Sequence, residues 1–261
     1  MDARTIDTAA DLLWRTWVTP TRIEALPAEC RPKDRADGYE IQAAVIGLSG
    51  QRVAGWKIAA TSQAGQRHIN VDGPLAGPLL DRRALLPGMT VSLEDNHMRA
   101  AEAEFAFRFG KPLPARAEPY TSDEVLAAVA SLHPAIEVPD SRYFDFTKVG
   151  AAQLIADCAC ACWYRIGHVV EANWRADDLV HHAVTARKNG EVVGTGSGAN
   201  VLGDPRVALT WLVNELSTHG RGIAANDVVM TGTCLVPVTV SPGDHVRMDF
   251  GAYGAVDVSF A

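Results

Sequence analysis

Hydrophobic and polar positions alternate most regularly over residues 101–109. Apolar residues recur at every second position there, which is the period of a half-buried β-strand rather than of a helix. On such a strand the three phenylalanines point into a core, while Glu102 and Glu104 share the opposite face with their Cα atoms about 7 Å apart. Like charges this close repel unless a cation lies between them. The stretch therefore predicts either a solvated strand face or half of an oxygen-ligand site for Mg²⁺ or Mn²⁺.

The first fifty residues have a helical pattern. Leu12, Leu13 and Trp17 fit one face of a first helix, and the apolar positions within Tyr39–Leu48 predict a second helix that ends at Gly50. A polar, proline-containing connector separates the two. We therefore expect a helical N-terminal segment over residues 1–50 and one further domain over residues 51–261.

After Gly50 the pattern changes to short strands separated by Gly and Pro. Strands are predicted at residues 53–59, 136–138, 156–166, 183–188, 191–194, 228–231, 236–240, 245–250 and 256–260. Helices are predicted from Ser62 to Ile69, from the capping box of Thr121 and Glu124 through Leu132, and from Asp204-Pro205 to Gly220. Residues 71–78 have the composition of a turn, and Asn189-Gly190 predicts a hairpin. Without regular βαβ alternation, this order favours an α+β protein with a curled, mainly antiparallel or mixed sheet.

Composition excludes several classes of partner. The 261 residues are 48% hydrophobic and 21% charged, which is typical of a globular protein. The net charge of −7 argues against nucleic acid as a partner, because backbone phosphates require clustered Lys and Arg. No stretch approaches the roughly 20 apolar residues that span a bilayer. We therefore expect a cytoplasmic protein that binds neither nucleic acid nor membrane.

Three of the five cysteines alternate in the order Cys158, Cys160 and Cys162. On a strand this spacing places all three thiols on one face, whereas zinc sites commonly use Cys-x-x-Cys pairs. We favour small buried apolar side chains over a zinc site.

Two further charges interrupt apolar segments. Glu137 lies in an otherwise apolar strand, so it is expected either to bind a metal or to pair with an arginine such as Arg142. Lys57 lies between Trp56 and Ile58. It is either a surface lysine whose methylene chain is buried while its ammonium reaches solvent, or a group placed for proton transfer.

These residues belong to a longer series of motifs. In order along the chain they are GWKIAATS from residue 55, VDGP from 71, EAE from 102, PAIEV from 134 with Ser141-Arg142, NVLGDP from 200, TGT from 231 and PGD from 242. The series resembles the fumarylacetoacetate hydrolase superfamily, and within it the branch of 2-keto-4-pentenoate (2-hydroxypenta-2,4-dienoate) hydratases and 4-oxalocrotonate decarboxylases. The resemblance runs from about Ile41 to the C-terminus. It implies a β-rich roll with a mixed sheet core, commonly assembled as a homodimer or larger homo-oligomer.

The resemblance also implies roles for individual residues. It implies that Glu102, Glu104 and Glu137 ligate one Mg²⁺ or Mn²⁺ and that Lys57 lies beside the substrate. It further places Asp72 near the mouth of the site, and Ser197 and Thr233 where they can hydrogen-bond the substrate. His68, on the short helix before Asp72, is a further candidate, although a lone His is more often structural.

The chemistry expected of such a site is hydration. A 2-oxo or 2-hydroxy acid can chelate a divalent cation, which stabilises the enolate that develops during protonation, and water then adds at C4. We expect Lys57 to transfer the proton, with its pKa lowered by desolvation unless a nearby carboxylate opposes the shift. The predicted activity is a metal-dependent hydratase of aromatic compound catabolism. The alternative reactions are decarboxylation of a 2-oxo-dicarboxylate and carbon–carbon hydrolysis of an acylpyruvate. A non-catalytic subunit is a further alternative, but the presence of Lys57 and all three carboxylates argues against it.

Overall fold

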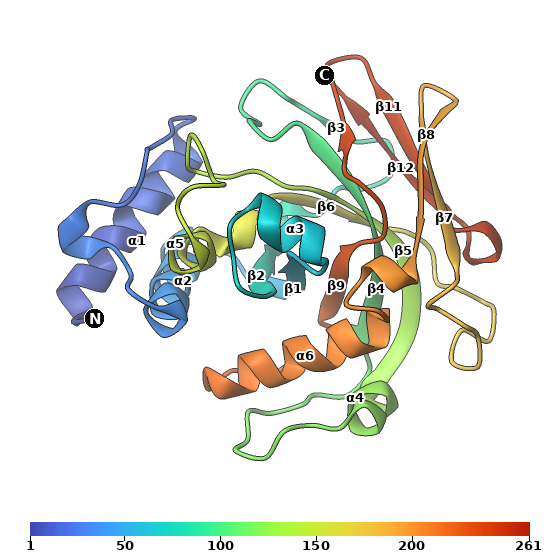
Figure 1. The fold of residues 1–261 in the computed structure, drawn as a ribbon, viewed down its shortest axis with the longest axis horizontal. Helices are drawn as coiled ribbons and strands as arrows, with labels where there is room; N and C mark the ends of the chain where they lie inside the picture. Colours follow the sequence, from blue (N-terminus) through green and yellow to red (C-terminus); the bar gives the residue numbers. More distant parts are fainter.

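The computed structural model describes residues 1–261 and contains two β-sheets, one in the middle of the molecule and one at its side (Figure 1). Both sheets are mixed, since each combines antiparallel pairs with one parallel pair. The first sheet has the order β2 (Leu75–Leu80), β1 (Val53–Ala59), β9 (Val228–Thr233), β4 (Ala100–Phe109), β5 (Val129–Val138) and β6 (Trp163–Ile166), and β10 (Val238–Thr239) also pairs with β4. The second sheet has the order β3 (Thr90–Val91), β12 (Ala255–Phe260), β11 (His245–Asp249), β7 (Ala183–Lys188) and β8 (Glu191–Ser197).

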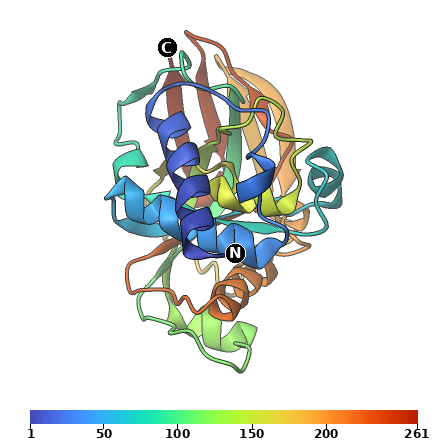
Figure 2. The same cartoon turned by 90° about the vertical axis from the view of Figure 1, so that its left-hand side faces the viewer.

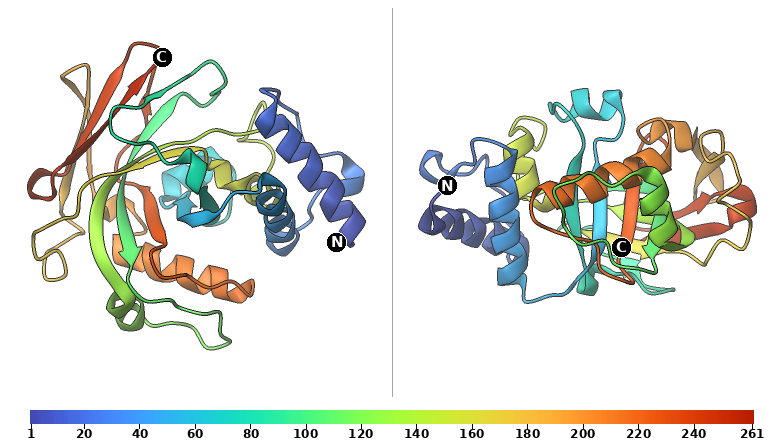
Figure 3. Two further views of the ribbon diagram at one scale, coloured as in Figure 1. Left: turned by 180° about the vertical axis from the view of Figure 1, so that it is seen from behind. Right: turned by 90° about the horizontal axis from the view of Figure 1, so that it is seen from below.

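Six α-helices surround the sheets. They are α1 (Ala3–Val18), α2 (Arg35–Ser49), α3 (Gln63–His68), α4 (Ser122–Ala128), α5 (Ala151–Ala156) and α6 (Pro205–Thr218). Figure 2 shows α1 crossing α2 on the side of the molecule that faces away from the second sheet. In Figure 3, α6 and α4 lie together at another edge. None of these helices combines the length and apolar character needed to cross a membrane.

Local sequence signals account for several helix ends. The side chain of Asp204 accepts a hydrogen bond from the Arg206 amide, and Pro205 occupies the first turn of α6. Gly50 ends α2 with a φ of +59°, a left-handed conformation that glycine adopts at little cost. Thr121 and Glu124 form the expected capping box at the start of α4.

The main core lies where the sheets and α6 meet. Phe105, Phe107 and Phe109 are 0% exposed there, which confirms the predicted buried face of β4. A smaller cluster joins α1 and α2 to the segment that contains Tyr143 and Cys158. The predicted α+β class is confirmed, and the Asn189-Gly190 turn joins β7 to β8 as expected.

Four predicted elements differ from the structure. The helix predicted through Leu132 ends at Ala128, and the chain continues as β5 because it pairs with β4 from Val129 onward and with β6 from Ala135. The strand predicted at 156–166 starts at the last residue of α5 and passes through a 3₁₀ turn at Cys158–Cys160, so that only β6 is a strand. The turn predicted at 71–78 contains the start of β2, which is fully buried. The strand predicted at 236–240 is also shorter and consists of β10 alone.

Candidate active site

Three glutamates meet on the first sheet. β4 and β5 run antiparallel with Glu102 directly opposite Glu137, and Glu104 lies two residues further along β4. One carboxylate oxygen from each residue lies within 4.8 Å of those from the other two. Glu104 and Glu137 are 0% exposed, whereas Glu102 is half-buried. The structure therefore brings together the three carboxylates that the sequence analysis selected.

These carboxylates lack the partners that buried charges need. Glu104 Oε1 and Glu137 Oε1 are buried without a hydrogen-bond donor, and Glu137 Oε2 has only the ammonium of Lys57 beside it. Burial, and next the charge of Glu137, raises the pKa of Glu102 to about 7 and raises the pKa of Glu104 as well. A hard divalent cation supplies the positive charge that such a group of oxygens needs. The donor set therefore fits Mg²⁺ or Mn²⁺.

One backbone amide fixes the orientation of Glu104. Gly232 N–H donates to Glu104 Oε2 at 2.7 Å. Gly232 has a φ of +100°, and a Cβ there would lie 2.3 Å from Thr61 Oγ1. Only glycine fits this position, so the Thr-Gly-Thr motif serves to bring an N–H donor to the carboxylate.

Lys57 completes the cluster from β1. Its side chain is 3% exposed, and Nζ lies 3.0 Å from Glu137 Oε2 and donates to the Ala159 carbonyl oxygen at 3.0 Å. Desolvation lowers the pKa of Lys57, but the charges of Glu137, Glu102 and Glu104 outweigh it, so the net shift is upward. The opposing effect of a nearby carboxylate, which the sequence analysis allowed for, therefore prevails over desolvation, and three carboxylates contribute to it.

Arg142 is not the partner of Glu137. Its guanidinium pairs with Asp157, and the two side chains are 2% and 1% exposed. Ser141 Oγ also donates to Asp157 Oδ2 at 2.7 Å. This buried group holds the segment after β5 against the turn that follows α5.

The turn after α5 supplies the carbonyl oxygen that accepts the hydrogen bond from Lys57. Cys158, Ala159 and Cys160 have φ values of 53°, 50° and 61°, a run of left-handed residues that is unfavourable for side chains with a Cβ. Opposite the turn lies Gly77, where a Cβ would come 2.1 Å from the Cys158 carbonyl oxygen. The turn places the Ala159 carbonyl toward Lys57, a feature that no side-chain motif could predict.

The cysteines therefore do not line one strand face as predicted. Cys158 and Cys160 lie in the left-handed turn, and only the residues from Trp163 onward are extended. All three thiols are free, and burial raises the pKa of Cys158 and Cys160 to about 12 and that of Cys162 to about 11. They are neutral thiols at physiological pH.

The remaining candidate residues lie at different distances from this centre. Thr233 pairs with Glu104 across β9 and β4, and its hydroxyl donates to the Leu235 carbonyl at 2.7 Å. Ser197 joins the same region through its amide, which donates to the Cys234 carbonyl. His68 contacts the ring of Phe146, and the side chain of Asp72 is 81% exposed and pairs with Arg35. Neither of these two side chains hydrogen-bonds or ion-pairs with the glutamates or with Lys57.

Most of the chain matches a known protein family. The family described as fumarylacetoacetate (FAA) hydrolase C-terminal matches residues 81–260. This chain belongs to the fumarylacetoacetate hydrolase family. Its predicted family and β-rich fold are thereby confirmed.

The relatives considered below are named either as hydratases or as decarboxylases. A 2-keto-4-pentenoate hydratase of Burkholderia vietnamiensis is 31% identical over 262 residues, which cover 99% of this chain and 98% of that protein. A 4-oxalocrotonate decarboxylase of Pseudomonas putida is 34% identical over 228 residues, covering 86% and 85%. The solved structure of 4-oxalocrotonate decarboxylase from Pseudomonas putida G7, complexed with magnesium and adipate, has a TM-score of 0.90 and 28% identity, covering 100% of this chain and 99% of that one.

Proposed function

We propose that this protein is a metal-dependent hydro-lyase that adds water to a short 2-hydroxy-dienoate or 2-oxo-enoate and forms a 4-hydroxy-2-oxo acid. The observation that carries the proposal is the group of three carboxylates beside the ammonium of Lys57, because two of them, Glu104 and Glu137, are fully buried and have unpartnered oxygens. The hydratase names of several relatives that are 31–33% identical support this reaction, as part of aromatic compound catabolism.

Glu102, Glu104 and Glu137 would hold one Mg²⁺ or Mn²⁺. When bound, such an ion polarises the carboxylate and C2 oxygens of a chelating 2-oxo acid. The protein contributes fixed ligands, because Gly232 N–H orients Glu104 and the pairing of β4 with β5 sets Glu102 opposite Glu137. The crystallised relative complexed with magnesium supports this assignment.

Lys57 would move the proton. Nζ is held between the Glu137 carboxylate and the Ala159 carbonyl, so one N–H remains to face a substrate. As an ammonium it can donate a proton to the carbon chain and recover it from water. Ser197 and Thr233 are proposed to bind the substrate, and Asp72 and His68 to act from the entrance.

Decarboxylation is the second candidate. It is favoured by the solved decarboxylase that matches the whole chain with a TM-score of 0.90. The same chelating site could stabilise the enolate left by loss of CO₂. Acylpyruvate hydrolysis is weaker, because the His219–Glu215 pair contacts Tyr39 and Arg35 rather than the carboxylate cluster.

One assay separates these reactions. The Mg²⁺-loaded enzyme is offered 2-hydroxypenta-2,4-dienoate and, separately, 4-oxalocrotonate, and both the 4-hydroxy-2-oxo acid and released CO₂ are measured. Hydrated product from the first compound supports the proposal. Stoichiometric CO₂ from the second, with no hydration of the first, would identify a decarboxylase.

We also propose a cytoplasmic homo-oligomer. The resemblance to a family commonly assembled as homodimers or larger homo-oligomers supports the assembly, and sedimentation of the purified protein tests it. A monomeric mass at the concentration of the activity assay would contradict the proposed oligomer. It would not affect the proposed reaction, which the product assay tests separately.

A further inference from the structure

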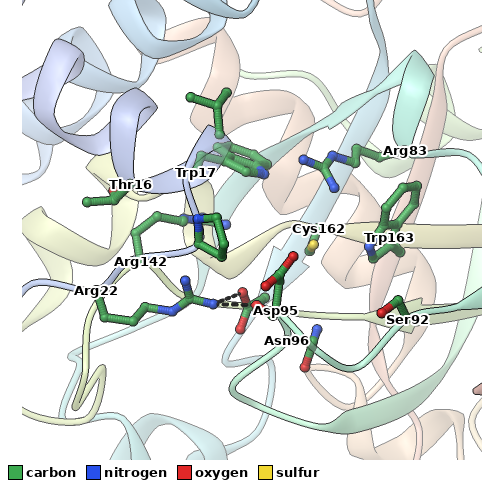
Figure 4. Close-up of a pocket in the computed structure, with 13 residues that line it drawn as sticks. Thr16, Trp17, Arg22, Arg83, Ser92, Asp95, Asn96, Arg142, Cys162 and Trp163 are labelled. Carbon is green, nitrogen blue, oxygen red and sulfur yellow. Dashed lines mark hydrogen bonds and ion pairs between the residues drawn. The ribbon is translucent and has the colours of Figure 1, made fainter. Parts of the chain in front are cut away.

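A second polar cavity lies at the end of α1, outside the carboxylate cluster. It has a volume of about 410 Å³ and opens between the C-terminal end of α1 and the start of β6 (Figure 4). Trp17, Arg22, Arg83, Asp95, Cys162 and Trp163 are among its lining residues. Neither Lys57 nor any of the three glutamates lines it. A volume of this size accommodates a small organic molecule.

Arg83 is the free cation of this cavity. Its guanidinium carbon lies 4.6 Å from the ring centre of Trp163 and 5.6 Å from that of Trp17. It forms no hydrogen bond or ion pair with the protein, although two aromatic rings hold it in place. Figure 4 shows its guanidinium pointing into the space between the two tryptophans. A guanidinium positioned this way can bind a carboxylate through two N–H groups.

Two other donors at the cavity wall also lack acceptors. Trp17 Nε1 and Arg22 Nε are buried without a hydrogen-bond partner, and the Arg22 side chain is only 5% exposed. Buried N–H groups are rarely left unpaired, because the loss of hydration is not repaid. Two buried, unpaired N–H groups beside the unpaired guanidinium of Arg83 therefore indicate a ligand that supplies acceptor oxygens.

The other charges of the cavity define the ligand further. Arg22 is neutralised by Asp140, and Arg142 by Asp157. This leaves Arg83 as the unpaired cation and Asp95 as an exposed carboxylate with no side-chain partner. An anion beside Arg83 would repel Asp95 unless the ligand also presents a hydrogen-bond donor to it.

We propose that this cavity binds a small planar carboxylate that bears a hydroxyl group at its opposite end. The carboxylate bonds to Arg83 and the neighbouring N–H groups, the planar body lies against the tryptophans, and the hydroxyl donates to Asp95. The site is independent of the proposed reaction, since it shares no residue with the carboxylate cluster.

The probe for this site is 4-hydroxybenzoate, with benzoate and phenol as matched compounds that lack one group each. Binding to the Mg²⁺-loaded protein is followed by equilibrium dialysis and by tryptophan fluorescence, because Trp17 and Trp163 form the walls. We expect 4-hydroxybenzoate to bind best and benzoate several-fold more weakly. Phenol binding as tightly as 4-hydroxybenzoate would overturn the proposal, because the carboxylate would then not be recognised.

Variants locate the binding. Arg83→Gln should weaken 4-hydroxybenzoate about tenfold or more, because a charge-assisted pair is lost. Arg82→Gln is the control, since Arg82 is exposed and does not line the cavity. Trp17→Phe replaces the indole by a smaller aromatic ring without an N–H, and should weaken binding by a smaller factor even if Arg83→Gln folds poorly. Binding that is retained in both cavity variants but lost in Glu104→Gln would place the probe on the carboxylate cluster and overturn the proposal.

Discussion

At the scale of single residues, the proposed centre depends on charges that have been taken out of water. Lys57 and Glu137 are almost fully buried, and each would be costly alone. Together with Glu102 and Glu104 they carry an excess of negative charge, which explains why the pKa of Lys57 rises despite its burial. Burial, and then the same excess of negative charge, explains why the pKa values of Glu102 and Glu104 are raised. One lysine does not balance three glutamates, and a divalent cation would.

Lys57→Met tests the proton-transfer role. Methionine keeps much of the length and apolar packing but removes the ammonium, so turnover should fall by about 10²–10⁴-fold, as is typical for loss of general acid–base catalysis. Metal binding, measured by equilibrium dialysis, should persist because the three glutamates remain. Lys111→Met, at an exposed position, is the matched control. Normal turnover of the Lys57→Met enzyme would remove lysine from the mechanism.

Glu104→Gln tests metal binding. The amide keeps the shape of the side chain and can still accept from Gly232 N–H, but one ligand charge is lost. We therefore expect turnover to collapse and Mg²⁺ affinity to fall while the fold is retained. Glu118→Gln, at an exposed position, should behave like the unsubstituted protein. Full turnover in the presence of a chelator would contradict metal dependence.

At the scale of elements, the sequence predicted those features that depend on local pattern. The alternation in β4 and the capping signals of α4 and α6 act over a few residues, so both could be inferred. The start of β5 could not, because Val129–Leu132 continues the helical pattern and becomes extended only through pairing with β4. The turn at Cys158–Cys160 could not be predicted either, because its left-handed backbone is supported by contacts with Gly77 and Lys57, which lie far away in the sequence.

Gly77→Ala tests whether that turn positions Lys57. The added Cβ would meet the Cys158 carbonyl oxygen, so the turn must move and its bond from Lys57 to Ala159 must weaken. We expect a loss of stability of about 1–3 kcal/mol, as for other overpacked sites, together with a lower kcat. Gly47→Ala on α2 is the control, because nothing lies within 4 Å of its added Cβ. Thermal unfolding and steady-state kinetics measure the two effects, and an unchanged kcat in a folded Gly77→Ala enzyme would show that the turn is only structural.

At the scale of the whole molecule, the carboxylate cluster lies where distant parts of the chain converge. β1 supplies Lys57, β4 and β5 supply the glutamates, and β9 supplies the Gly232 amide. The segment after α5 closes the group by accepting from Lys57, and its Asp157–Arg142 pair is packed against Trp17 of α1. A ligand that binds only this assembled arrangement should therefore stabilise the complete fold.

Magnesium should stabilise the protein in a pH-dependent way. The pKa of Glu102 is raised from 4.5 in the unfolded chain to about 7, so the metal-free fold loses stability as the pH rises from about 4.5 through about 7. Mg²⁺ competes with those protons and binds the deprotonated carboxylates, so its stabilising effect should grow over the same range. Scanning calorimetry with excess MgCl₂ or EDTA should show a small difference in Tm at pH about 5.5 and a larger one at pH about 8. Glu104→Gln should reduce the difference at the higher pH, and an equal difference in Tm at both values would show that the carboxylate protons do not compete with the metal.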